Sequence, residues 1–199
     1  MRKLLLIILL ISPVLILFSQ ESNKGLVLEI PLIKTELNQK KYSGLSKIDE
    51  INSVKYSTGI NVGYSWRIPL PLNIKFEIRP GVFLSDLDLF GVNLGIYLRG
   101  NIIHPVFANL GIKTHYNFGF EDSHISWGQK SQSGFYFNPV LSLGMPITNK
   151  FSIMIGYSYY LEKNWRESWS SDYLTPNYFE TTEKLKWYLF LGIEINNLL

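Results

Sequence analysis

The sequence of 199 residues contains no cysteine, which excludes a disulfide framework, a thiolate metal site and a lipid-modified N-terminal cysteine. Charged residues are also scarce, because Asp, Glu, Lys and Arg make up only 18% of the chain and the formal net charge is +3. Since no Lys/Arg cluster is present either, this balance argues against a nucleic-acid surface. After the first 18 residues, no apolar run approaches the ~20 residues that a membrane-spanning helix needs.

The N-terminal segment has the layout of a secretory signal peptide. Arg2 and Lys3 form a positive start, residues 4–18 are almost all apolar, and the small Ser19 could precede a cleavage point. The apolar run is shorter than a spanning helix and contains Pro13, which favours a cleaved signal over a permanent anchor. We therefore expect residues 1–19 to be a signal peptide and residues 20–199 to form one exported domain.

The rest of the chain alternates between apolar and polar residues with a period of two. This pattern predicts β-strands that each have one apolar and one polar face. The alternating runs cover residues 26–33, 54–66, 72–84, 90–99, 106–117, 134–145, 151–162 and 185–196. Eight such strands, joined in sequence, predict an all-β protein with a closed antiparallel up-and-down barrel.

The connections between the runs alternate in length. Short turns are expected at residues 67–71, 100–105 and 146–150, because these segments are rich in Pro, Gly or Asn. Long polar loops are expected at residues 35–52, 119–132 and 164–182, with one short link at 85–88. Short turns on one side and long loops on the other are typical of outer-membrane barrels.

The position of the aromatic residues indicates which face is outside. Between the strand ends the apolar face is mostly aliphatic, as at Ile60, Leu94 and Leu191. Aromatic residues of that face cluster near the strand ends, as two membrane interfaces would select: Tyr64, Trp66 and Phe151 near the short turns, and Tyr56, Phe90, Tyr116, Phe135, Phe137, Tyr157, Tyr159 and Trp187 near the long loops. The sequence therefore predicts a transmembrane β-barrel whose apolar face contacts lipid.

With these features the chain resembles the small eight-stranded outer-membrane β-barrel proteins of Gram-negative bacteria, often labelled a porin family. The resemblance rests on the signal peptide, the alternating runs and the loop asymmetry, and covers nearly all of the mature chain. It implies location in the bacterial outer membrane, contact with outer-membrane lipids and insertion by the barrel-assembly machinery. Members often end in an aromatic residue, whereas this chain ends in Leu198 and Leu199.

The polar face of the strands predicts the contents of the lumen. Eight strands enclose a space that side chains can fill, whereas open porins use roughly 16–18 strands. Buried charges must be paired, so we expect a salt-bridged plug, with a narrow solute path as the alternative. The charged residues expected to face inward are Glu29, Lys55, Lys75, Glu77, Arg79, Arg99, Lys113, His115, Glu162, Lys186 and Glu194.

Few residues suggest chemistry. His124 and Ser126, with Glu121 and Asp122 nearby, are similar to the His–Ser pair of the lipid A deacylase barrels, which implies a lipid A-modifying hydrolase as an alternative function. A soluble, lipocalin-like ligand carrier is a further alternative. No Gly-rich phosphate loop or metal-binding spacing is present, so we expect no cofactor and no metal.

The last long loop is rich in aromatic residues, namely Trp165, Trp169, Tyr173 and Tyr178. Exposed aromatic side chains can bind an extracellular protein or glycan, or they can extend the outer aromatic girdle or fold back over the barrel mouth. The leading hypothesis is therefore a non-enzymatic outer-membrane barrel with a plugged polar lumen, whose role is structural or depends on its long extracellular loops.

Overall fold

The structure is a computed structural model that describes residues 24–44, 46–85, 89–123, 127–171 and 177–196. Most of these residues lie in β-strands, and a 3-10 turn, η1 (Pro71–Asn73), joins the second strand to the third. None of the described residues form a helix that is long and apolar enough to cross a membrane. The strands are β1 (Lys24–Ser43), β2 (Ser46–Pro69), β3 (Ile74–Ser85), β4 (Phe90–Ile103), β5 (Val106–Asn117), β6 (Phe120–Ser123), β7 (Trp127–Ser131), β8 (Gly134–Pro146), β9 (Phe151–Ser171) and β10 (Asn177–Asn196).

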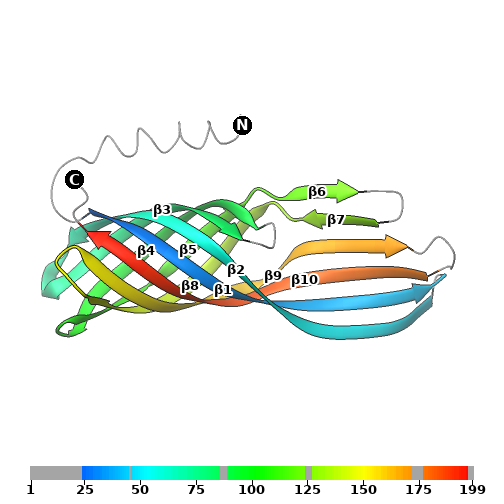
Figure 1. Ribbon diagram of the computed structural model, residues 1–199, viewed down its shortest axis with the longest axis horizontal. Helices are drawn as coiled ribbons and strands as arrows, with labels where there is room; N and C mark the ends of the chain where they lie inside the picture. The colour runs from blue at the N-terminus through cyan, green and yellow to red at the C-terminus, as the bar shows by residue number, and fades with distance from the viewer. Residues whose placement is uncertain (1–23, 45, 86–88, 124–126, 172–176, 197–199) are drawn as a thin grey trace.

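Eight of the strands form a closed antiparallel barrel (Figure 1). The order around the barrel is β10, β1, β2, β3, β4, β5, β8 and β9, and β10 pairs with both β1 and β9. Because the first and last strands pair, the barrel has no open edge in which backbone groups would lack partners. The predicted all-β fold and its eight-stranded barrel are confirmed.

The two faces of each barrel strand differ in the way that the alternation predicts. On β9, Ser152, Met154 and Ser158 are at most 3% exposed, whereas Ile153 and Ile155 are 48% and 56% exposed. The same division holds on β10 and β1, where isoleucine and leucine side chains lie outside and Glu29 and Glu194 lie inside. A barrel with an apolar exterior and buried charges is the arrangement that a lipid environment stabilises.

Four strands continue well beyond the barrel and form, with a short hairpin, a second region that we call the outer extension (Figure 1). It consists of residues 35–43 of β1, 46–58 of β2, 163–171 of β9 and 177–185 of β10, together with β6 and β7. The hairpin β6–β7 joins this sheet because β7 pairs with β9, from Trp127 opposite Ser170 to Ser131 opposite Arg166.

The prediction that residues 35–52, 119–132 and 164–182 form loops is wrong. Most of these residues are β-strand, and the β1–β10 register continues through them with Asn38 opposite Thr182. The error has a physical cause: most residues of the extension are polar, so the apolar alternation that marks a strand in the sequence stops. Backbone pairing does not need that alternation and continues.

Candidate functional site

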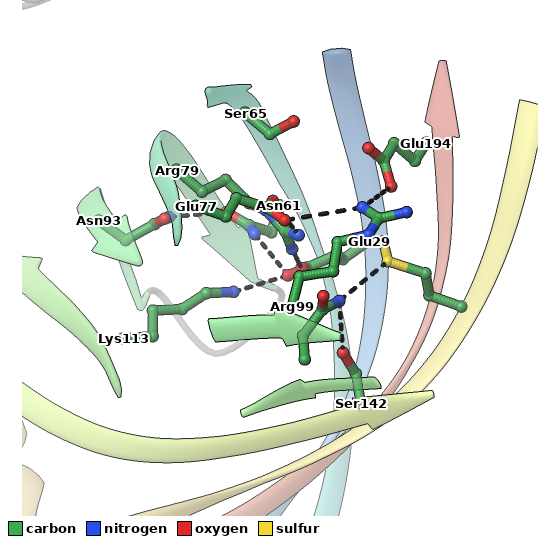
Figure 2. A network of polar contacts seen from close by, with 12 residues as sticks. Glu29, Asn61, Ser65, Glu77, Arg79, Asn93, Arg99, Lys113, Ser142 and Glu194 are labelled. Carbon is green, nitrogen blue, oxygen red and sulfur yellow. Dashed lines mark hydrogen bonds and ion pairs between the residues drawn. The ribbon is translucent and has the colours of Figure 1, made fainter. Parts of the chain in front are cut away.

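The barrel interior holds a network of buried ion pairs between β1, β2, β3, β4, β5 and β10 (Figure 2). Arg79 donates to Glu29 at 2.8 Å and to Glu77 at 2.5 Å, and Lys113 donates to Glu29 at 2.6 Å. Nearer the end of the barrel where β1 begins and β10 ends, Arg99 Nη1 is 2.7 Å from Glu194, which also contacts Arg67. Each carboxylate therefore has at least one cation within hydrogen-bonding reach, as burial demands.

Two of these ion pairs cross the lumen from one wall to the opposite wall. Glu29 lies on β1 and Lys113 on β5, which are four strands apart in either direction around the barrel. Arg99 on β4 and Glu194 on β10 are also four strands apart in both directions. Side chains from opposite walls thus meet near the barrel axis, where an open channel would need free space.

Amide side chains add further hydrogen bonds to the network. Asn61 donates to Glu29 at 2.6 Å, and Asn93 donates in turn to Asn61 at 2.6 Å. Glu29 therefore accepts hydrogen bonds from Arg79, Lys113 and Asn61. Charge-assisted hydrogen bonds of this kind offset part of the desolvation cost of a buried carboxylate.

An aromatic cluster occupies the lumen next to the charged network. Tyr97, Tyr136, Tyr160, Tyr188 and Phe190 are all about 2% exposed. The ring of Tyr97 lies 4.7 Å from the Arg79 guanidinium carbon, and Lys113 Nζ lies 5.6 Å from the Tyr188 ring. The cations of the network are therefore covered by aromatic faces as well as paired with carboxylates.

Glycine residues on the inner face make room for these rings. A Cβ atom at Gly156 would lie 2.2 Å from Phe190 Cζ and 2.7 Å from Ser142 Cβ. In the same way, a Cβ atom at Gly144 would lie 2.2 Å from Phe107 Cζ. Small residues on one strand thus allow large rings on another to fill the narrow lumen.

Gly156→Ala is expected to destabilise the barrel by about 1–3 kcal/mol, because the added methyl group overlaps the Phe190 ring in a filled interior. The measurement is the urea concentration at half-unfolding in phospholipid vesicles, followed by tryptophan fluorescence. Gly100→Ala is the matched control, since a Cβ at Gly100 meets nothing within 4 Å. Equal midpoints for the two variants would contradict a lumen packed around Phe190.

Two charged residues predicted to face inward lie elsewhere. Lys55 is exposed on the outer extension, so its predicted place in the lumen is wrong. Lys186 is also misplaced by the prediction, because its ammonium lies 3.1 Å from Glu36 at the outer end of the barrel. The cause is a β-bulge: Thr35 is opposite Leu185 and Lys34 is opposite Trp187, so Lys186 has no opposite residue on β1. Leu185, expected on the lipid face, is fully buried instead.

The remaining predicted lumen residues divide into three groups. Glu29, Glu77, Arg79, Arg99, Lys113 and Glu194 meet in the network described above. His115 is buried in the aromatic cluster, with its ring centroid 5.1 Å from that of Phe83, and Lys75 is half-buried. The side chain of Glu162 lies outside the described part of the structure.

Arg67 also lies in the network, although the sequence predicts a turn at residues 67–71. Strand β2 continues to Pro69, and Arg67 is an even number of residues from the inward-facing Asn61 and Ser65, so it lies on the same face. Extending the alternation by one residue beyond Trp66 would have found it.

The predicted aromatic girdle residues lie on the barrel exterior, where each is half-buried or exposed: Tyr56, Tyr64, Trp66, Phe90, Tyr116, Phe135, Phe137, Phe151, Tyr157, Tyr159 and Trp187. Toward the outer extension, neighbouring rings touch, with Trp187 between Tyr56 at 6.3 Å and Tyr157 at 6.1 Å. Near the opposite end, Tyr64 and Trp66 pack edge to face at 5.5 Å. The rings therefore form two bands separated by aliphatic side chains.

The aromatic residues predicted for loop interactions have different positions. Trp165 is fully buried in the interior cluster, so its predicted availability for partners is wrong. Trp169 lies against Gly128, and Tyr178 packs against Tyr42 at 5.9 Å on the outer extension. Tyr173, His124 and Ser126 lie outside the described residues, as does the segment 1–19.

No group of three or more His, Cys, Asp or Glu residues that could hold a metal ion occurs in the described ranges. The buried carboxylates are bonded to cations, so the interior offers ion pairing rather than free ligands. The arrangement can hold opposite walls of the barrel together.

A closed barrel with an apolar exterior, two aromatic bands and an interior of ion pairs has the fold of the small outer-membrane β-barrels. No family model and no curated protein matches the sequence. Among solved structures, the chain is similar to Neisserial surface protein A (12% identity, covering 85% of this chain and 97% of that chain, TM-score 0.41). It is similar to the outer membrane protein OprG from Pseudomonas aeruginosa (10%, 87% and 96%, TM-score 0.46). A third is the outer membrane protease OmpT from Escherichia coli (9%, 90% and 99%, TM-score 0.39).

Proposed function

We propose that the protein is an integral barrel of the bacterial outer membrane with a closed lumen, and that its role is structural or depends on surface interactions of the outer extension. The observation that supports a closed lumen is that two ion pairs cross the barrel, Glu29–Lys113 and Arg99–Glu194. A conducting path would have to displace them, and separating a buried pair is costly.

The exposed isoleucine and leucine side chains of the barrel support placement in a membrane. A soluble carrier of lipophilic ligands needs the opposite arrangement, with apolar side chains inside. The first strand, β1, begins and the last strand, β10, finishes at the side of the barrel remote from the outer extension, because Gly25 is opposite Asn196. In outer-membrane barrels that side faces the periplasm, so the extension is extracellular.

No catalytic role is proposed for the barrel, because the buried carboxylates of the lumen are paired with arginine and lysine side chains. The extension displays polar strands, and an extracellular protein or glycan is the kind of partner that such a surface can bind. Outer-membrane lipids contact the barrel exterior, and the assembly machinery inserts it after export through the N-terminal segment.

The purified protein is expected to give no stable conductance steps in planar lipid bilayers, because side chains from opposite walls meet inside the lumen. A 16-stranded porin inserted in the same bilayers is the positive control. Insertion is verified by recovering the protein from the bilayer lipid after the recording. Large, stable, ohmic currents from the inserted barrel would contradict a closed lumen.

A further inference from the structure

The outer extension contains a polar groove of about 590 Å³. Strands β1, β2, β9 and β10 all contribute to it, and its lining includes Glu36, Asn38, Lys40, Asn52, Asn164 and Lys184. The groove is partly preorganised, because Asn38 donates hydrogen bonds to Asn52 at 2.8 Å and to Glu50 at 2.5 Å. These contacts fix the amide groups at its floor.

The groove lies on the face of the sheet that continues the lipid-facing surface of the barrel. The β1–β2 register is unbroken from Leu32, which faces lipid, to Glu36 and Asn38, so alternate β1 residues stay on one face. Val54, which lines the groove, is two residues from the girdle residue Tyr56. A molecule whose acyl chains lie against the barrel could therefore place its head group in the groove.

Charge is unevenly distributed along this face. Near the membrane end are Lys34, Lys184 and Lys186, with Lys34 Nζ 5.9 Å from the Trp187 ring and Lys186 paired with Glu36. Lys184 lies opposite Glu36 in the register, yet it forms no ion pair among the described residues. The membrane end of the groove is thus cationic.

Apart from Glu36, which is paired with Lys186, the acidic groups of this face lie farther from the membrane and are already engaged. Lys47 and Asn38 lower the pKa of Glu50 through hydrogen bonds, and Lys47 forms an ion pair with it. Glu180 accepts a hydrogen bond from Tyr42 at 3.2 Å, and Glu167 accepts one from Gln132 at 3.2 Å. Paired carboxylates and amides present acceptors and donors that suit hydroxyl groups.

We propose that this groove binds the phosphorylated saccharide head group of an outer-leaflet glycolipid, which rests on the proposed extracellular position of the extension. The phosphate lies near Lys34 and Lys184 at the membrane end, where ammonium groups attract it. The saccharide hydroxyls bond to Asn38, Asn52 and Glu50. The acyl chains lie on the apolar exterior of the barrel below the groove.

Binding of lipid A to the purified full-length protein in non-ionic detergent micelles tests the proposal, with native mass spectrometry or thermophoresis as the readout. The expected result is saturable binding that Lys184→Glu weakens at least tenfold. Lys184→Gln, which removes the charge without reversing it, is expected to weaken binding several-fold. Lys130→Glu on β7 is the matched control, because Lys130 is exposed and pairs with Glu121 at 3.4 Å. Folding of each variant is checked by its heat-dependent gel mobility.

Three further ligands separate the sources of the chemistry. Phosphatidylglycerol, which has a phosphate but no saccharide, and inorganic phosphate are each expected to bind at least tenfold more weakly than lipid A. Equal affinity for phosphatidylglycerol or for inorganic phosphate, an equal loss in Lys130→Glu, or no saturable binding would overturn the proposal. The deacylated disaccharide phosphate is expected to bind more weakly than lipid A, and equal binding would overturn the role of the acyl chains. Because conductance is measured separately, a leaky lumen and an empty groove are distinguishable failures.

Discussion

Glu29→Ala is expected to lower the free energy of unfolding by about 3–5 kcal/mol, the cost of leaving a buried charge without its partner. Lys113 has Glu29 as its only carboxylate within ion-pair distance among the described residues, and it lies at the centre of the lumen between aromatic rings. Arg79 is less affected, because Glu77 remains 2.5 Å away. The measurement is a urea titration of the folded protein in phospholipid vesicles, followed by tryptophan fluorescence.

Two controls isolate the effect of the orphaned ammonium. Glu121→Ala removes a carboxylate of an exposed ion pair on the outer extension and is expected to change the midpoint little. The double variant Glu29→Ala/Lys113→Met removes the stranded cation and is expected to recover part of the loss. If Glu29→Ala and Glu121→Ala gave the same midpoint, the lumen would have to be hydrated and the network would not be a closed plug.

Leu191→Arg is expected to cost about 2–4 kcal/mol, which is the penalty for arginine on the lipid face near the bilayer midplane. Leu191 is 65% exposed and lies on β10 between the girdle residue Trp187 and Ile195, which is opposite Phe151 in the second aromatic band. An exposed leucine of a water-soluble protein would tolerate the same change. The folded fraction after refolding into vesicles, read from gel mobility, gives the measurement.

The matched control for this substitution is Leu72→Arg. Leu72 is 89% exposed and lies in the turn η1, outside the aromatic bands. We expect this variant to refold like the parent protein. Equal refolding of Leu191→Arg and Leu72→Arg would indicate that the band around Leu191 does not contact acyl chains.

Local alternation was enough to predict the barrel, because lipid on one side and a crowded lumen on the other impose a period of two on every spanning strand. It identified Glu29, Glu77, Arg79, Arg99, Lys113 and Glu194 as inward-facing, and these side chains are buried or nearly so. The alternation predicts the face of each residue but not which of these charged side chains form ion pairs with one another. The Glu29–Lys113 contact depends on the strand order and tilt of the closed barrel.

Predictions from the alternation were wrong where the backbone is irregular or where the strand does not contact lipid. The bulge at Lys186 reverses the faces of β10, so Leu185 enters the interior and Lys186 leaves it, and a bulge has no signature in a single sequence. Beyond the girdle no lipid imposes an apolar face and most residues are polar, so the strands of the outer extension were predicted as loops. Trp165 shows the same limit, because only tertiary packing places it inside.

The central claim is that the exterior isoleucine and leucine side chains contact lipid while the outer extension is in water. Because the chain has no cysteine, a single nitroxide label at Leu191→Cys or Asn52→Cys reports one position without background. In phospholipid vesicles, the label at 191 is predicted to be relaxed strongly by oxygen and weakly by a water-soluble nickel complex, and the label at 52 the reverse. A label at 191 that the nickel complex relaxes as strongly as the label at 52 would contradict the claim.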